Sequence, residues 1–168
     1  MSGTGTGRSA TNQCSARAAV AALIAAVLGC FLCACGDKPS TLDDLRTTEV
    51  ALPNGVKIRA EAMRQATDLM RGMMFRDSLA PDRGMLFFHQ QEAPAPYYTF
   101  QVKIPLDIIW MDRDRRIVAI AANVPPCPAK SAADCPVYGG KMPTLFVLEV
   151  NAGFAAKNGL KIGDQLDF

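Results

Sequence analysis

Hydrophobic and polar residues alternate along two short runs of the chain, residues 47–52 and 56–62. Alternation with a period of two is typical of a strand that has one buried face. The tripeptide Pro53-Asn54-Gly55 separates the two runs. Because Asn-Gly is a strong signal for a tight hairpin turn, the pattern predicts a β-hairpin.

The hydrophobic period changes to three and four in residues 65–75, which predicts an amphipathic helix. The apolar positions of this helix are Leu69, Met70, Met73 and Met74. Methionine is frequent in this part of the chain, at Met63, Met70, Met73, Met74 and Met85. We interpret these methionines as core residues, because a flexible thioether fills irregular gaps. The alternative is a copper(I) site, because thioethers are suitable ligands for that ion.

Apolar runs bounded by Gly, Pro and charged residues predict the remaining elements. We expect strands at 84–89, 97–102, 106–112, 116–124, 144–150 and 162–168, loops at 90–96 and 125–143, and a helix at 152–158 that ends at Gly159. The mixed-charge residues 112–116 are expected to form a hairpin turn. The series predicts an α+β domain with a mainly antiparallel sheet, curled or partly closed into a β-barrel, and two short helices.

The N-terminal segment is organised like a bacterial export signal. Residues 1–17 are polar and weakly basic, and residues 18–35 are apolar or small. The segment ends in Leu32-Cys33-Ala34-Cys35, which resembles the bacterial lipobox. We therefore predict a lipoprotein signal peptide over residues 1–34, cleavage before Cys35, lipidation of Cys35, a flexible tether over residues 35–46 and a folded domain over residues 47–168.

These features predict the bacterial cell envelope as the location, with the domain on the periplasmic side and attached to the membrane through its lipid. The alternatives are lipidation at Cys30, an uncleaved transmembrane anchor and secretion without lipid. Loss of residues 1–34 removes Arg8 and Arg17, which leaves 16 of the 18 basic residues against 16 acidic residues. A neutral domain offers no basic face, so we expect no nucleic-acid partner.

Two cysteines, Cys127 and Cys135, lie in the expected loop 125–143. In an oxidising compartment two cysteines this close usually form a disulfide, which is the interpretation that we favour. A metal site and a redox pair are the alternatives. A structural zinc site needs four ligands, and the chain has one histidine, His89. A redox pair more often has C-x-x-C spacing.

Asp107 and Glu149 are the strongest candidates for chemistry, although neither is assigned as catalytic. Alternation places Asp107 on one face with Ile109 and Met111, and Glu149 on one face with Val147. A buried carboxylate needs a partner, or its pKa rises. Each acid is therefore expected to form a structural salt bridge or backbone cap, to line a ligand pocket, or to act as an acid–base catalyst. The candidate counter-ions are Arg71, Arg76 and Lys103.

Other polar and aromatic residues give weaker signals. His89 is expected at the surface or at a strand end, with a general base as the alternative. Tyr97, Tyr98 and Tyr138 are expected to be partly buried, or to line the mouth of a pocket. The sequence has no phosphate-binding Gly-rich loop, no dinucleotide fingerprint and no cluster of metal ligands, so we expect no cofactor and no metal.

Several motifs occur in a fixed order: RGMMFRDSL, RGMLFFH, IPLDIIWMD, CPVYGG, VLEVNAG and GLKIGDQLDF. Together they resemble the DUF192 family, also called UPF0127, over residues 47–168. The resemblance implies a small α+β, β-barrel-like domain that is often exported and often carries the disulfide-closed loop. It implies no activity.

One segment departs from the family pattern. Family members usually have Trp-Met-Lys-Asn-Thr where this chain has Tyr98-Thr99-Phe100-Gln101-Val102. If the family's Lys and Asn contact a ligand, Phe100 and Gln101 change that contact. Our candidate ligand-binding residues are therefore Arg76, Tyr98, Gln101, Asp107 and Tyr138.

Three functions remain open from the sequence. We favour a non-enzymatic domain in the envelope that binds a small molecule or a partner. The second is a hydrolase that uses Asp107 or Glu149 for acid–base chemistry. The third is an accessory protein that acts through its surface in an envelope complex.

Overall fold

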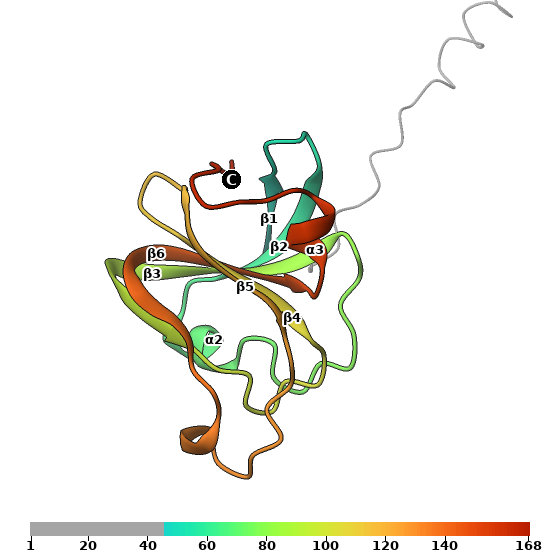
Figure 1. Cartoon of the computed structure of the whole chain (residues 1–168), viewed down its shortest axis with the longest axis vertical. Coiled ribbons are helices and arrows are strands. Elements are labelled where there is room, and N and C mark those ends of the chain that lie inside the picture. The colour runs from blue at the N-terminus through green and yellow to red at the C-terminus, as the bar shows by residue number, and fades with distance from the viewer. Residues whose placement is uncertain (1–45) are drawn as a thin grey trace, which may run out of the picture. The chain divides into compact units, whose positions relative to one another are not determined.

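The sheet at the centre of the domain is open and mixed (Figure 1). The computed structural model describes residues 46–168, which belong to one compact unit. The predicted signal peptide, the lipidation site Cys35 and nearly all of the predicted tether lie outside the described residues. The elements in chain order are β1 (Thr47–Ala51), β2 (Lys57–Met63), α2 (Ala66–Arg71), β3 (Arg83–Tyr97), β4 (Leu106–Met111), β5 (Ile117–Val124), the 3-10 helix η3 (Ala132–Asp134), β6 (Tyr138–Asn151) and α3 (Phe154–Lys157).

The strand order within residues 46–168 is β1-β2-β3-β6-β4-β5. The expected hairpins β1–β2 and β4–β5 are confirmed, and β6 pairs antiparallel with both β3 and β4. The sheet is therefore mainly antiparallel, as expected, but the parallel pair β2–β3 makes it a mixed sheet. The connection of residues 64–82 includes α2, and it is long enough for the crossover that parallel strands require.

Within residues 46–168 the sheet is not closed into a barrel, which was one of the two expected arrangements, and the predicted last strand is wrong. β1 and β5 are the two edges of an open sheet in the described part of the chain. The C-terminal residues make only isolated bridges, Gln165 with Arg116 and Asp167 with Ala51. These contacts connect the last residues to both edge strands without adding a strand to the sheet.

Two strands extend into segments that were expected to be loops. β3 continues through residues 90–96, and β6 begins at Tyr138 within the expected loop 125–143. The two strands pair along this extension, with register shifts between Phe88 and Ala93 and between Pro94 and Pro96. These irregularities allow a Pro-rich stretch to remain paired. The expected strand 97–102 is absent, because β3 ends at Tyr97 and the chain then turns.

The helix α2 is shorter than its periodicity predicts. It ends after Arg71, and Gly72 follows with a φ of 43°. Because the helical period stops there, Met73 turns into the core with 1% exposure, whereas Met70 is 77% exposed. The interpretation as core residues is therefore right for Met73 and Met85 and wrong for Met70.

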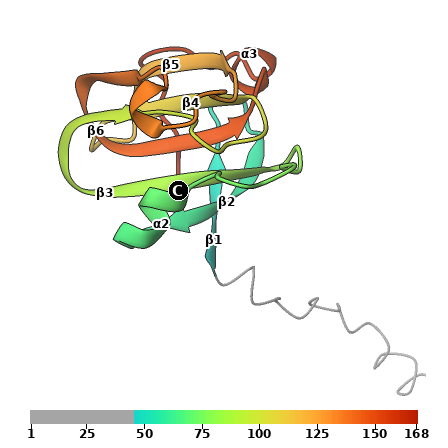
Figure 2. The ribbon, with the colours of Figure 1, turned by 90° about the horizontal axis from the view of Figure 1, so that it is seen from below.

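Each face of the sheet has its own hydrophobic core (Figure 2). The first core contains Ile109, Leu148 and Val150, and α3 and the C-terminal residues cover it. The second contains Phe87, Ile108 and others, and α2 and the loop after β3 lie against it. Because successive strand residues point to opposite faces, β4 is buried at all of its positions.

A disulfide joins Cys127 to Cys135, as expected. The loop that it closes is attached to the segment after β3, because Cys127 N donates to Thr99 O at 3.2 Å. Thr99 Oγ1 also donates to Pro125 O at 2.9 Å. A ring of this size stabilises the fold by roughly 2.6 kcal/mol in the chain-entropy model. The disulfide therefore fixes a segment that borders the cavity described next.

Candidate functional site

A cavity of about 450 Å³ lies between α2 and the second core. Most of its wall is apolar or aromatic, formed by Leu69, Met70, Met73, Phe87, Tyr97, Phe100 and other residues. Its polar lining residues include Glu149, His89, Tyr98 and Arg71. Ligand sites are commonly concave and apolar, with a few polar groups that orient the ligand. The cavity has both properties.

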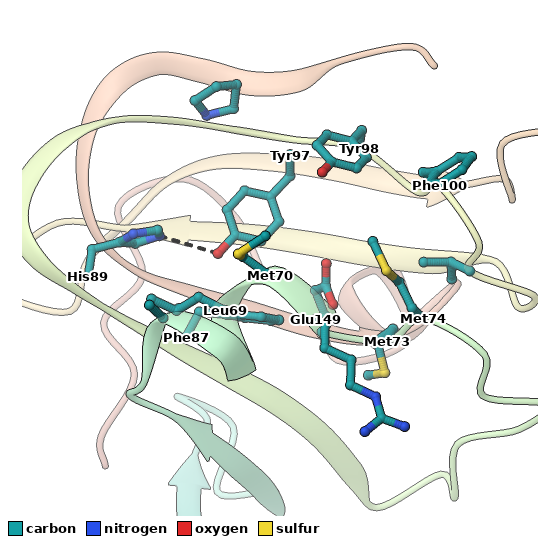
Figure 3. Close-up of a pocket in the computed structure, with 15 residues that line it drawn as sticks. Leu69, Met70, Met73, Met74, Phe87, His89, Tyr97, Tyr98, Phe100 and Glu149 are labelled. Carbon is teal, nitrogen blue, oxygen red and sulfur yellow. Dashed lines mark hydrogen bonds between the residues drawn. The ribbon is translucent and has the colours of Figure 1, made fainter. Parts of the chain in front are cut away.

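Glu149 provides the cavity with a buried acid (Figure 3). It lies in the central strand β6, opposite Met85 of β3 and Ile108 of β4, and its exposure is 5%. Its Oε2 has no hydrogen-bond partner. Burial disfavours the charged form and raises the pKa of Glu149 to about 8. The Glu149 carboxyl is therefore largely protonated at neutral pH.

Two further polar groups of the cavity come from β3. The hydroxyl of Tyr97 and Nε2 of His89 lie 3.2 Å apart, and their rings meet edge to face. Burial raises the pKa of Tyr97, and the nearby Glu149 raises it further. Burial lowers the pKa of His89. Both side chains are therefore uncharged at neutral pH and can donate or accept hydrogen bonds.

The position of Tyr97 depends on a close contact behind it. Gly139 of β6 lies against the indole of Trp110, and a Cβ atom at Gly139 would be 2.3 Å from the ring. Trp110 Nε1 donates to Ala95 O at 2.8 Å, which fixes the end of β3. Gly139 has a φ of 67°, so glycine is required there for both space and conformation. This contact explains the Gly139-Gly140 pair of the CPVYGG motif.

The rim of the cavity is formed by two turns with left-handed residues. Phe75 has a φ of 66° and Gln101 a φ of 57°. Phe75 N donates to Gln101 O at 2.9 Å, so the two turns support each other. Phe100, which lines the cavity, forms a bridge with Cys127. The departure from the family pattern at Phe100 and Gln101 therefore lies at the cavity, with Phe100 in its wall and Gln101 in its supporting backbone.

The structure places Asp107 outside this cavity. Its side chain is completely buried. Oδ1 accepts from the backbone N–H groups of Asn123 at 2.8 Å and Gly153 at 3.1 Å, and Oδ2 accepts from Ala155 N at 2.8 Å. Asp107 thus joins β4, the end of β5 and the start of α3. These three hydrogen bonds match one of the roles expected for Asp107, that of a backbone cap.

Asp107 and Glu149 do not meet. Glu149 lies opposite Ile108, and Asp107 lies opposite Val150. Directly opposite residues of neighbouring strands share a face, so the two acids lie on opposite faces of the sheet. The structure therefore does not bring the two acids into one site.

Among the other candidate ligand-binding residues, only Tyr98 lines the cavity. Arg76 forms a two-point ion pair with Glu61, with nitrogen–oxygen distances of 2.5 and 2.8 Å, and it lines a neighbouring depression. Gln101 is exposed. Tyr138 is partly buried against the second core and lies opposite Tyr97.

Sequence reasoning missed most of the apolar wall. Leu69, Phe87 and Val102 carry only a hydrophobic signal, which does not distinguish a cavity from a core. His89 was expected at a surface or strand end, and the structure places it half-buried in the cavity wall within β3. A clearer signal was available at Glu149, because an acid in the middle of the apolar run 144–150 breaks its pattern.

The domain can now be placed among known proteins. The family model DUF192, described as uncharacterized ACR, matches residues 49–168, and the chain belongs to this family. A crystal structure of a protein of unknown function from Novosphingobium aromaticivorans DSM 12444 is similar, with a TM-score of 0.67 and 33% identity over 77% of this chain and 90% of that one. A "putative transcription regulator" from Sinorhizobium meliloti 1021 has a TM-score of 0.62 and 26% identity over 71% of this chain and 89% of that one.

No curated protein matches the chain. Within residues 46–168, no helix is long and apolar enough to cross a membrane. The same residues contain no group of three or more His, Cys, Asp or Glu side chains that could hold a metal ion.

We predict that Asp107→Asn lowers the free energy of unfolding by about 3 kcal/mol. The amide group of asparagine must turn toward a backbone N–H that the carboxylate now accepts, and hydrogen bonds to a charged group contribute roughly 1.5–3 kcal/mol each. Urea unfolding at pH 7 measures the change. The control is Asp114→Asn in the exposed hairpin turn, which should change stability by less than about 0.5 kcal/mol. Equal stabilities of the two variants would contradict the capping role.

A second prediction concerns the pH dependence of Glu149. The pKa of Glu149 in the folded protein is about 8, against an ordinary value of 4.5. Its contribution to the free energy of unfolding is therefore fully present below pH 4.5 and is lost as pH rises toward 8. One proton difference corresponds to about 1.4 kcal/mol per pH unit. Relative to Glu149→Gln, the parent should therefore lose about that amount per unit between pH 5 and 8. Parallel stability curves for the two proteins would show that Glu149 ionises normally.

Proposed function

We propose that this protein is a non-enzymatic binding domain, tethered to the bacterial envelope, that holds a small molecule in the cavity beside α2. One observation carries the proposal: a cavity of about 450 Å³ contains a buried carboxyl oxygen with no partner. An unsatisfied buried polar group costs roughly 1–3 kcal/mol. A ligand that bonded to Glu149 would remove this cost and cover the apolar wall.

The form of the cavity supports binding rather than catalysis. Glu149 has no second carboxylate beside it in the cavity lining, because Asp107 lies on the other face. His89 and Tyr97 bond to each other rather than to a nucleophile. The cavity offers apolar surface, several aromatic rings and a few hydrogen-bonding groups, which are suited to binding a ligand.

The rim supports binding to a ligand that enters from solvent. Met70 and Tyr98 line the cavity and are exposed apolar side chains, at 77% and 44%. Burial of exposed apolar groups at the mouth of a cavity by a ligand lowers the free energy of the complex. A small molecule with an apolar body would cover them while its polar end reached Glu149.

The tether follows from the signal-peptide pattern, and its length suits a domain near the membrane. Residues 35–46 would span at most about 40 Å when fully extended. A lipidated Cys35 would keep the domain within that distance of the bilayer surface. Stable anchoring requires more than one acyl chain, which a multiply acylated N-terminal cysteine provides.

We predict that a screen of amines, amino acids, sugars, nucleotides and envelope fragments by thermal shift will find a compound that stabilises the oxidised domain. At 100 times its Kd, the compound should add about 2.7 kcal/mol of stability by mass action. Tyr98→Ser should weaken its binding by about tenfold, since a contact at the mouth is lost. Ile162→Ser, at an exposed apolar residue outside this cavity, is the matched control and should bind normally.

Two results would contradict the binding function. A screen in which no compound shifts the unfolding temperature would favour an accessory protein that acts through its surface. A stabilising compound that binds Tyr98→Ser and the parent equally would place the ligand elsewhere.

The anchor gives a separate prediction. The full chain, expressed in a Gram-negative bacterium with labelled palmitate, should carry the label and fractionate with membranes. Cys35→Ser should abolish both, and Cys30→Ser should leave both unchanged. The reverse pattern would move the lipidation site to Cys30. A parent chain that carries no label would exclude a lipid anchor.

A further inference from the structure

Four aromatic side chains surround the cavity that contains Glu149. Phe87 and Tyr97 come from β3, and Tyr98 and Phe100 come from the turn that follows it. Figure 3 shows the carboxyl group of Glu149 pointing into the space beside Tyr97 and the methionines. The sulfur-containing side chains of Met70, Met73 and Met74 complete the wall, and Glu149 is the only acid among the described residues that line it.

This combination fits a positively charged group. Aromatic faces attract cations through the ring quadrupole, and the attraction grows when the site excludes water. The carboxyl oxygen that has no partner is an acceptor, and charge-assisted hydrogen bonds are about twice as strong as neutral ones. We therefore infer that the ligand is an organic amine with an apolar body, whose ammonium group bonds to Glu149 inside the aromatic wall. This inference rests on the function proposed above and names its ligand class.

The other ionisable groups around Glu149 are compatible with an ammonium group. Tyr97 and His89 on β3 are uncharged at neutral pH, because burial shifts the pKa of each toward its neutral form. On β4, the residues that share the face of Glu149 are apolar, Leu106, Ile108 and Trp110. Tyr98, in the turn after β3, also faces the cavity.

The cations near the site lie outside the aromatic wall or at its mouth. Arg71 at the end of α2 lines the cavity but is exposed, so solvent screens its charge. Arg76 is held by Glu61 in the neighbouring depression. Arg83 is on the same sheet face as Glu149 but does not line the cavity, and its Nη1 is buried without a partner. Burial is the cause of the raised pKa of Glu149.

The proton balance gives the inference a distinctive signature. The amine enters as an ammonium ion, and Glu149 must lose its proton to solvent before it can pair with that ion. With a pKa of about 8 in the free protein, the ionised fraction falls about tenfold for each pH unit below that value. Amine affinity should therefore rise about tenfold from pH 6 to 7, less steeply from pH 7 to 8, and then level off. A neutral ligand that needs the protonated carboxyl would show the opposite trend.

Tyramine, tyrosol and 4-hydroxyphenylacetate test the inference, because they share one ring and differ in carrying an amine, an alcohol or a carboxylate. Calorimetry on the full-length protein at pH 6 to 8.5 should show tyramine binding at least tenfold more tightly than tyrosol at pH 8.5. Titrations at pH 7 in two buffers of different ionisation enthalpy should show nearly one proton released per tyramine bound.

Glu149→Gln is the decisive variant. It should weaken tyramine binding at pH 8.5 by at least tenfold, abolish its pH dependence and leave tyrosol binding within about twofold. Asp77→Asn removes the same charge from an exposed residue outside the cavity, so it should behave like the parent. Circular dichroism checks that both variants fold.

The outcomes separate this inference from the proposed function. If tyrosol or 4-hydroxyphenylacetate binds as tightly as tyramine, or affinity falls as pH rises, the amine inference is wrong and the binding function stands. If none of the three binds while a compound without an amino group from the screen does, the amine inference is again wrong and the binding function stands. If no compound in either experiment binds, both proposals are wrong.

Discussion

The alternation of side chains between the two faces of β4 and β6 is the constraint on which the rest of the domain depends. Both strands lie inside the sheet, so both of their faces need cover. The chain supplies it from two sides: α3 and the C-terminal residues cover one core, and α2 and the loop after β3 lie against the other. On the first side the cover packs closely around Leu148 and Val150. On the second it leaves the cavity beside Glu149.

The same alternation gives the two buried acids different environments. Asp107 faces the well-packed side, where three backbone N–H groups donate to its carboxylate and connect α3 to the sheet. Glu149 faces the cavity, where one of its oxygens has no partner. A buried charge is stable only when it is paired and hydrogen-bonded, so Asp107 fits a structural role. Glu149 still has an oxygen that can accept a hydrogen bond, and this difference is the physical basis for proposing it, rather than Asp107, as the ligand-binding acid.

Local patterns in the sequence predicted the parts of the fold that depend on neighbouring residues. The Asn-Gly turn, the hairpin β4–β5 and the sheet faces of Asp107 and Glu149 all follow from local chemistry and a period of two. The long extensions of β3 and β6 could not be predicted, because Pro-rich and Gly-rich segments form strands there only by pairing with each other. The cavity was hidden for a similar reason: Phe87 and Phe100 lie far apart in the sequence, and only the turn supported by Gln101 brings Phe100 to the wall.

Glu149 is buried in the cavity with one carboxyl oxygen unpaired, and its titration tests this assignment most directly. In protein labelled with ¹³C at glutamate carboxyl carbons, NMR would follow each carboxyl shift with pH, and Glu149→Gln would assign the signal. We predict a midpoint near 8 for Glu149, well above the ordinary value of 4.5. A midpoint near 4.5 would mean that water or a cation already satisfies this carboxyl, and the binding site argued from it would be lost.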